Sequence, residues 1–219
     1  MALKLERTLR FHLACVSPTA TTLSFVLVHT VCLDRTVAAS ATKVMPGLGL
    51  FVKCIDGVDA DKASLTTALA KGESLAIAPG GIAEMFAGYP SKGFGKNEEA
   101  AVLLDRKGFI KLAVAGEVPI VPVFVFGNSS LFRRLHVPGL QTVSKLLRAS
   151  LVVMYGRGGL PFMPRRVPLR FVVGEPIWPS RGGGDRVEIM HRAVSDEVEK
   201  VFREGRGDYG WGDRTLRLV

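Results

Sequence analysis

The amino-acid sequence predicts an α/β fold in which helices cover a layered sheet. Two continuous apolar runs end at glycine: residues 75–78 stop at Pro79-Gly80-Gly81, and residues 119–126 stop at Gly127. The second run is apolar without alternation, which is typical of a strand covered on both faces. Helical and strand patterns alternate along the chain, and this alternation favours layers of helix and sheet over an all-α or all-β fold.

The elements follow from local patterns. Asp61 is a good N-cap for a helix over residues 61–71, and a strand over 75–79 follows. Asn97, before two glutamates, marks a further helix start, with a loop up to Leu104 as the open alternative. The remaining predicted elements are a helix over 106–116, strands over 119–126, 151–155 and 169–173, and a helix over 185–203.

The helix over 185–203 has the clearest helical periodicity. Its apolar stripe contains Val187, Met190, Val194, Val198 and Val201 and includes His191. A histidine on such a stripe is predicted to be structural.

The two apolar runs also predict where a ligand would lie. Open α/β sheets bind ligands at the carboxyl ends of their strands. Gly80 and Gly81 follow the first run and leave their amides open to close approach by a ligand, or they make a turn only. Between the runs lie Glu84 and a basic group, residues 106–108 with Lys111. Cationic side chains at a helix start suit a phosphate ligand, and the alternative is a solvated basic helix face.

Five ordered segments, residues 80–84, 106–113, 121–127, 156–158 and 172–177, carry a more specific signal. In order and spacing they resemble the type-2 diacylglycerol acyltransferase family, from about Ala41 to Phe202. The resemblance implies a glycerolipid acyltransferase-like single domain over 41–219. It implies an O-acyltransferase that moves a fatty acyl group from acyl-CoA to a diacylglycerol or monoacylglycerol hydroxyl.

The same resemblance implies partners and residue roles. Acyl-CoA would be the co-substrate with no further cofactor, and a neutral glycerolipid and a membrane surface would be the partners. The endoplasmic reticulum membrane is the expected location, with a plastid as the alternative. Glu84 takes an active-site role by resemblance. Gly80, Gly81, Arg106, Lys107, Gly108 and Lys111 would bind substrate.

The catalytic base is where the sequence departs from the family, whose His-Pro-His-Gly block it does not contain. His29 and Asp34 spell HxxxxD, the pattern of the wider glycerolipid acyltransferase superfamily, in which the aspartate orients a histidine base. We therefore predict His29 as the base and Asp34 as its partner. His12 is the second candidate, and a packed structural role for His29 is the alternative.

Two interpretations of the absent block stay open. The sequence is a truncated form of a longer protein, or it is a relative that has lost activity and binds lipid or a partner enzyme. Residues 1–40 are predicted to be an atypical N-terminal segment. Residues 11–33 contain no Asp, Glu, Lys or Arg and are long enough for a membrane span of ~20 residues, but Pro18 and several Ser and Thr residues favour a soluble start of the fold.

The composition and the absence of certain motifs limit which other functions are possible. The 219 residues carry a net charge of +9, which favours anionic partners such as membrane surfaces. Cys15, Cys32 and Cys54 form no CxxC pair, so we expect neither a metal site nor a disulfide framework. The sequence has no nucleotide-binding glycine loop and no GxSxG elbow. It also lacks the aromatic-basic interleaving of single-strand binders, so we expect no nucleic-acid partner.

Overall fold

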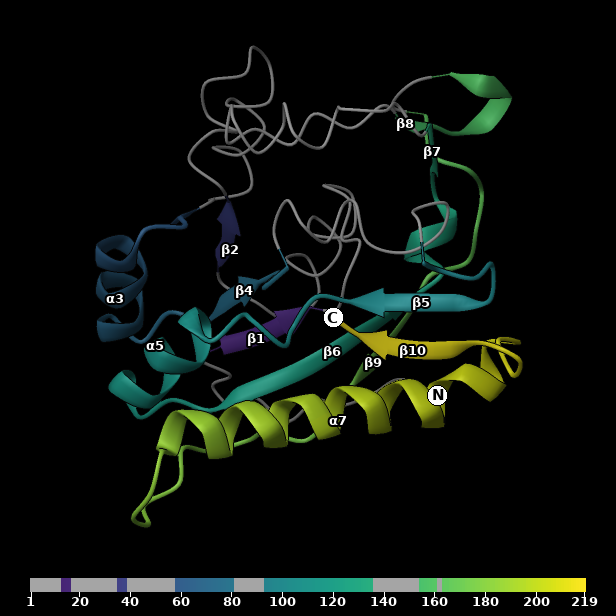
Figure 1. Ribbon diagram of the computed structural model, residues 1–219. Helices are drawn as coiled ribbons and strands as arrows, with labels where there is room; N and C mark the ends of the chain where they lie inside the picture. Colours follow the sequence, from purple (N-terminus) through teal and green to yellow (C-terminus); the bar gives the residue numbers. More distant parts are fainter. Residues whose placement is uncertain (1–12, 17–34, 39–57, 81–92, 136–153, 161–162) are drawn as a thin grey trace, which may run out of the picture.

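A six-stranded sheet forms the centre of the protein in the computed structural model, which describes residues 13–16, 35–38, 58–80, 93–135, 154–160 and 163–219 (Figure 1). The strands lie in the order β3 (Val58–Asp59), β2 (Arg35–Ala38), β4 (Leu75–Ile77), β1 (Leu13–Val16), β6 (Ile120–Phe126) and β9 (Arg170–Val173). Neighbouring strands are parallel, except that β9 runs antiparallel to β6. This arrangement confirms the predicted α/β class.

Strand β6 is buried along its whole length, as its continuous apolar sequence predicts. Its side chains alternate between two apolar clusters because successive residues of a strand point to opposite faces of the sheet. Phe124 and Phe126 belong to the main core, whereas Val123 and Val125 pack in a second cluster with Ala76. The side chains on both faces of this strand are therefore buried.

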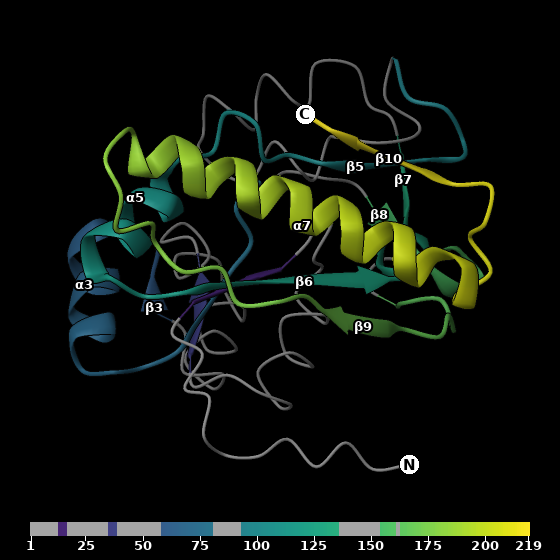
Figure 2. The same ribbon diagram turned by 90° about the horizontal axis from the view of Figure 1, so that it is seen from below.

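Among the described residues, three α-helices pack against the sheet: α3 (Lys62–Ala70), α5 (Gly108–Gly116) and α7 (Arg186–Asp208). Helix α7 runs alongside β6, and α5 lies beside the first turns of α7 (Figure 2). The predicted stripe of α7 faces the core, where Met190, Val194, Val198 and Val201 are buried. Phe202 of α7 places its ring 5.1 Å from that of Phe124, so the helix extends the apolar cluster of β6.

The local sequence predicts helix α3 correctly, but it does not predict the element near residue 97. Asp61 is the N-cap of α3, and its carboxylate accepts a hydrogen bond from the Ser64 amide at 3.0 Å, as predicted. The predicted helix start at Asn97 is wrong. Residues Glu98–Ala101 form strand β5, which pairs in parallel with β10 (Thr215–Leu218) in a small separate sheet. The partner strand lies more than 100 residues away, so the local sequence does not reveal this pairing.

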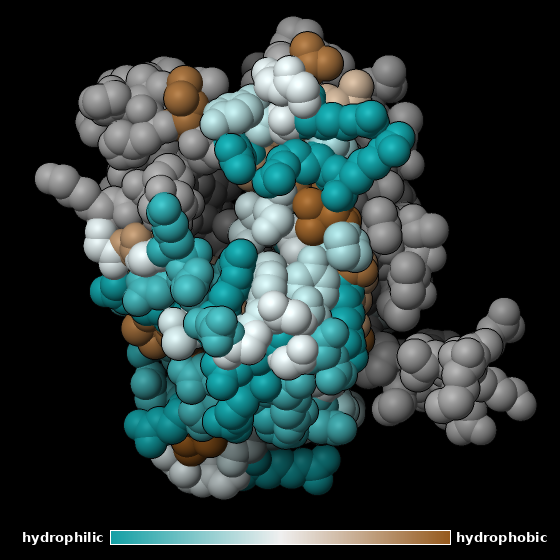
Figure 3. All heavy atoms as spheres, turned by 90° about the vertical axis from the view of Figure 1, so that its right-hand side faces the viewer, coloured by the Kyte–Doolittle hydropathy of each residue, from teal (hydrophilic) through white to brown (hydrophobic). Residues whose placement is uncertain are grey.

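A small antiparallel hairpin lies beyond the carboxyl end of β6, after the short helix η2 (Asn128–Ser130). It consists of β7 (Arg133–Arg134) and β8 (Met154–Tyr155), and the short helix η3 (Arg157–Gly159) follows. Figure 3 faces this end of the molecule and shows separate hydrophobic groups among hydrophilic ones. Within the described ranges, no helix is both long and apolar enough to cross a bilayer.

Gly127, which ends β6, is expected to tolerate no side chain. Its φ is +86°, and a Cβ would overlap the Tyr209 hydroxyl and the Pro168 carbonyl oxygen, which are themselves joined by a 2.6 Å hydrogen bond. Backbone strain and overpacking together should lower the free energy of unfolding of Gly127→Ala by about 2–4 kcal/mol. Chemical denaturation measures this loss.

Gly72→Ala is the matched control for Gly127→Ala. Gly72 has a similar φ of +76°, but a Cβ at this position would meet no atom within 4 Å, so only the strain of roughly 1–2 kcal/mol should remain. Equal losses in the two variants would contradict the steric part of the prediction.

Candidate active site

The carboxyl ends of three adjacent parallel strands meet at one edge of the sheet. Strand β1 lies between β4 and β6 and is parallel to both. Gly80 follows β4 by three residues and is buried, and Gly127 directly follows β6. The structure thus confirms that the two glycine-ended runs are buried strands that point to the same edge, where open α/β sheets bind ligands.

The basic group lies at the start of α5, which begins slightly later than the sequence predicted. The helix begins at Gly108, so Arg106 precedes it and Lys107 is its N-cap residue, without a side-chain capping bond. Arg106 and Lys111 are exposed. Glycine at the first helical position explains the late start, because it has little intrinsic preference for helix.

Lys107 has a partner on α7. Its ammonium group donates to a Glu188 carboxylate oxygen at 2.5 Å. The hydrogen bond and the charge attraction raise the pKa of Lys107 and lower the pKa of Glu188. The pair therefore stabilises the fold between the ordinary pKa values of the two groups. Its contribution is lost below that range as Glu188 is protonated, and above it as Lys107 loses its proton.

Both ends of α5 are joined to the start of α7. At the far end, Arg186 forms an ion pair with Glu117, the C-cap residue of α5, at 2.6 Å. Together with Lys107–Glu188, this pair holds the short helix against the first turns of the long one. The start of α5, where the substrate-binding residues were predicted, is thereby fixed relative to the sheet.

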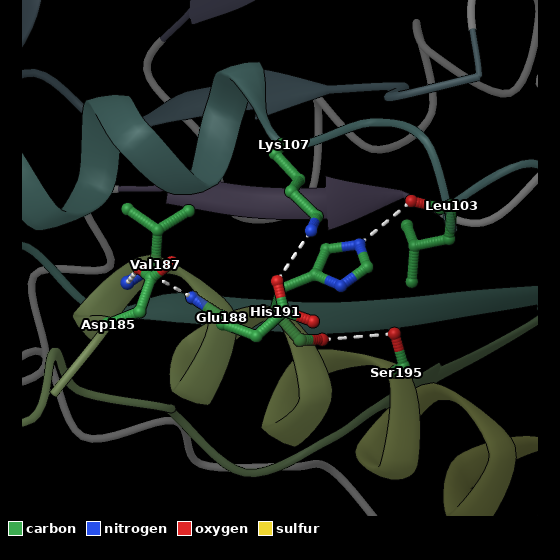
Figure 4. Close-up of polar contacts among 7 residues, drawn as sticks. All are labelled: Leu103, Lys107, Asp185, Val187, Glu188, His191 and Ser195. Carbon is green, nitrogen blue, oxygen red and sulfur yellow. Dashed lines mark hydrogen bonds and ion pairs between the residues drawn. The ribbon is translucent and has the colours of Figure 1, made fainter.

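A second set of contacts anchors the segment that leads into α5 (Figure 4). The buried His191 ring donates from Nε2 to the Leu103 carbonyl oxygen at 2.9 Å. Ser195 Oγ donates to the His191 carbonyl oxygen at 3.0 Å. At the start of α7, Asp185 accepts hydrogen bonds from the amides of Val187 and Glu188. His191 is therefore a structural residue that positions the segment before Lys107, as predicted.

A buried acid in β5 was missed by sequence reasoning. Glu99 is 8% exposed, forms an ion pair with Arg214 and accepts a hydrogen bond from Ser129 Oγ at 3.0 Å. Burial raises the pKa of Glu99, and the attraction of Arg214 opposes that rise. Arg214 also stacks on the Trp211 ring, 4.2 Å from its centroid. The apolar residues that follow Glu99 were the available signal for a buried strand.

Several predicted site residues lie outside the described residues: His12, His29, Asp34, Gly81 and Glu84. The structure therefore brings together the basic start of α5 and the first turns of α7. It places Gly80 at the carboxyl edge of the sheet. In the part of the chain that the structure describes, no group of three His, Cys, Asp or Glu side chains could hold a metal ion.

Comparisons with known proteins agree on one family. The sequence profile of the family "Diacylglycerol acyltransferase" matches residues 33–218. The chain is 29% identical over 171 residues to 2-acylglycerol O-acyltransferase 1 of Bos taurus, covering 70% of this chain and 49% of the relative. It is 29% identical over 154 residues to human 2-acylglycerol O-acyltransferase 3, covering 64% and 43%. The chain thus spans about half the length of the curated relatives it matches.

A solved structure shares the fold. The crystal structure of the 1-acyl-sn-glycerophosphate acyltransferase PlsC from Thermotoga maritima superimposes with a TM-score of 0.52 at 15% identity. The match covers 88% of this chain and 65% of that one. The sequence profile spans most of the chain, and the chain therefore belongs to the diacylglycerol acyltransferase family.

Proposed function

We propose that this chain is an acyl-CoA-dependent O-acyltransferase that acts on diacylglycerol or monoacylglycerol at a membrane surface. The observation that carries the proposal is the family match over residues 33–218. The names of the curated relatives, which are acylglycerol O-acyltransferases, point to the same reaction. The endoplasmic reticulum membrane is the proposed location, and a plastid membrane is the alternative.

The proposed reaction exchanges a thioester for an ester. The acceptor hydroxyl oxygen attacks the thioester carbonyl carbon while a base takes the hydroxyl proton, and the CoA thiolate leaves and is protonated. We assign the base to His29, its orientation to Asp34, and an active-site role to Glu84. Backbone amides after β4, at Gly80 and Gly81, are suited to approach the substrate closely because no side chain intervenes.

An acyl-transfer assay tests the proposal. The purified chain is incubated with labelled oleoyl-CoA and either 2-monoacylglycerol or 1,2-diacylglycerol in mixed micelles, and the labelled ester is quantified. Ester formation above a heat-denatured control is the expected result. Tight binding of oleoyl-CoA without ester from either acceptor would overturn the enzyme assignment and favour an inactive lipid-binding relative.

The basic start of α5 is predicted to bind the CoA phosphates. Arg106→Ala/Lys107→Ala should weaken oleoyl-CoA binding about three- to tenfold and flatten its salt dependence, because two exposed charge contacts are lost. Glu188→Gln should act in the opposite direction, since it releases Lys107 from its ion pair. Titration calorimetry at several salt concentrations measures both effects.

The matched control is Lys62→Ala/Lys71→Ala, which removes two positive charges from the exposed surface of α3. This variant should bind oleoyl-CoA like the unchanged protein. If both double variants lose affinity equally, the effect is one of net charge, and Arg106 and Lys107 have no place in the binding site.

A further inference from the structure

The positive charge of this protein is concentrated in one stretch of the sequence. Residues 118–174 contain eight of the 29 Lys and Arg residues and none of the 20 Asp and Glu residues. The rest of the chain therefore carries 21 basic against 20 acidic residues and is close to neutral. A segregated charge of this kind creates a one-signed field at the surface where the stretch is exposed.

The described residues of this stretch that connect β6 to β9 lie at one end of the molecule, beyond the carboxyl end of β6 (Figure 1). We call its exposed side chains the basic face: Leu135, Arg157, Leu160, Met163, Arg165 and Arg166. Hairpin β7–β8 precedes the loop that carries most of them, and the Arg165 amide donates to the Leu131 carbonyl oxygen at 2.8 Å. The two segments are therefore side by side.

Backbone hydrogen bonds join Gly156 and Arg157, after β8, to Leu160 and Met163. The Gly156 amide donates to the Leu160 carbonyl oxygen at 3.0 Å, and the Arg157 amide donates to the Met163 carbonyl oxygen at 2.9 Å. A Cβ at Gly156 would overlap that Met163 carbonyl oxygen, so the backbones of residues 156 and 163 are in contact. The side chains of Arg157, Leu160 and Met163 are exposed.

Large apolar side chains of the basic face are exposed to solvent. Leu160 is 54% exposed, Leu135 is 52% exposed and Met163 is 47% exposed. Apolar side chains interspersed with arginines are the composition of surfaces that lie in the membrane interface.

The nearby acids do not neutralise the arginines. Glu99 is paired with Arg214, and Asp208 is paired with Arg170 at 2.9 Å. Among the described residues, Arg157, Arg165 and Arg166 have no ion pair. Their guanidinium groups remain free for bidentate contacts with phosphate groups.

We propose that the basic face docks this protein on an anionic lipid bilayer. Arg157, Arg165 and Arg166 contact phosphate headgroups, and Leu160 and Met163 enter the boundary between headgroups and acyl chains. The exposed apolar side chains favour a bilayer over a soluble polyanion, because a polyanion offers no apolar region in which these side chains could be buried. This inference rests on the membrane location in the proposed function and is independent of the reaction.

The geometry relates docking to the candidate active site. The basic face follows the carboxyl end of β6, the same edge of the sheet to which β4 and β1 point. A bilayer held at this end would present a dissolved glycerolipid to the strand ends, whereas acyl-CoA can arrive from water.

Vesicle flotation tests the docking surface. The purified chain is mixed with vesicles of phosphatidylcholine alone, or of phosphatidylcholine with phosphatidylserine, at low and high salt. Flotation with the anionic vesicles at low salt, and loss of flotation at high salt, is the expected result. Arg165→Glu/Arg166→Glu should weaken this binding by roughly 30-fold or more, since each basic residue near an anionic surface contributes about fivefold. Leu160→Ser/Met163→Ser should weaken flotation at low salt, although it leaves the net charge unchanged.

The matched control is Arg192→Glu/Arg203→Glu, which makes the same change in net charge on the exposed side of α7. It should lose far less vesicle affinity. Equal losses in the two charge-reversal pairs, or equal flotation with neutral vesicles, would overturn the proposal. Displacement of the chain from vesicles by free CoA or by an oligonucleotide would also overturn the proposal. Displacement by free CoA would assign the basic face to the acyl donor. Circular dichroism confirms folding of each variant.

Acyl transfer in neutral detergent micelles separates the two proposals. Arg165→Glu/Arg166→Glu should retain its rate there while it loses vesicle binding. A chain that floats with anionic vesicles but forms no ester in micelles would overturn the proposed function and leave the docking surface supported.

Discussion

Replacement of His29 by alanine is expected to lower acyl-transfer turnover by roughly 10²–10⁴-fold while the fold survives. A neutral imidazole near pH 7 can take the proton of the acceptor hydroxyl, and alanine has no group that can do so. Turnover of His29→Ala is measured in the micelle assay with saturating oleoyl-CoA and 2-monoacylglycerol. Oleoyl-CoA affinity should be unchanged, because the base acts on the acceptor and not on the donor.

Asp34→Asn and His12→Ala complete this test. Asp34 is proposed to orient the imidazole and raise its basicity, so Asp34→Asn should lower the rate by less and shift the acid limb of the rate profile to lower pH. His12→Ala should keep the full rate. Full activity of His29→Ala together with loss of activity in His12→Ala would transfer the role of base to His12.

Replacement of Arg214 by glutamine is expected to destabilise the fold by about 3 kcal/mol at neutral pH, because it leaves the Glu99 carboxylate buried without its cation. Among the described residues, Glu99 would then retain only the Ser129 hydroxyl as a partner. The loss should become smaller in acid. Burial already raises the pKa of Glu99, and removal of Arg214 raises it further, so the variant takes up the proton at a higher pH than the unchanged protein.

The sign of this pH dependence can be checked directly. In the unfolded chain Glu99 ionises at its ordinary pKa, whereas in the folded variant it stays protonated to higher pH, so the variant should lose stability as pH rises through that interval. Urea denaturation at acid and neutral pH measures the change. Arg217→Gln is the control on the adjoining strand β10, because Arg217 is exposed and donates to the Gly93 carbonyl oxygen rather than to a buried acid. A loss for Arg214→Gln that does not vary with pH would contradict the assigned cause.

Much of the fold was predictable because its signals are local. A carboxylate cap at Asp61, a stripe of apolar residues along α7 and the unbroken apolar run of β6 each act within a few residues of sequence. The ordered motifs also predicted the family, and the sequence profile confirms this prediction over residues 33–218. The candidate site was predictable to the extent that it lies at the ends of β4 and β6. The roles of His29, Asp34 and Glu84 stay predictions.

The sequence by itself determined the α/β class, the buried strands, the long helix and the family of this protein. Tertiary structure decided the rest, because the partners involved are distant in sequence and their pairing energy depends on burial. Glu98–Ala101 became a strand only through its pairing with β10. Lys107 was joined to Glu188, 81 residues away, and Glu99 to Arg214, 115 residues away. The partners in each of these contacts are far apart in sequence, and only the packed chain brings them together.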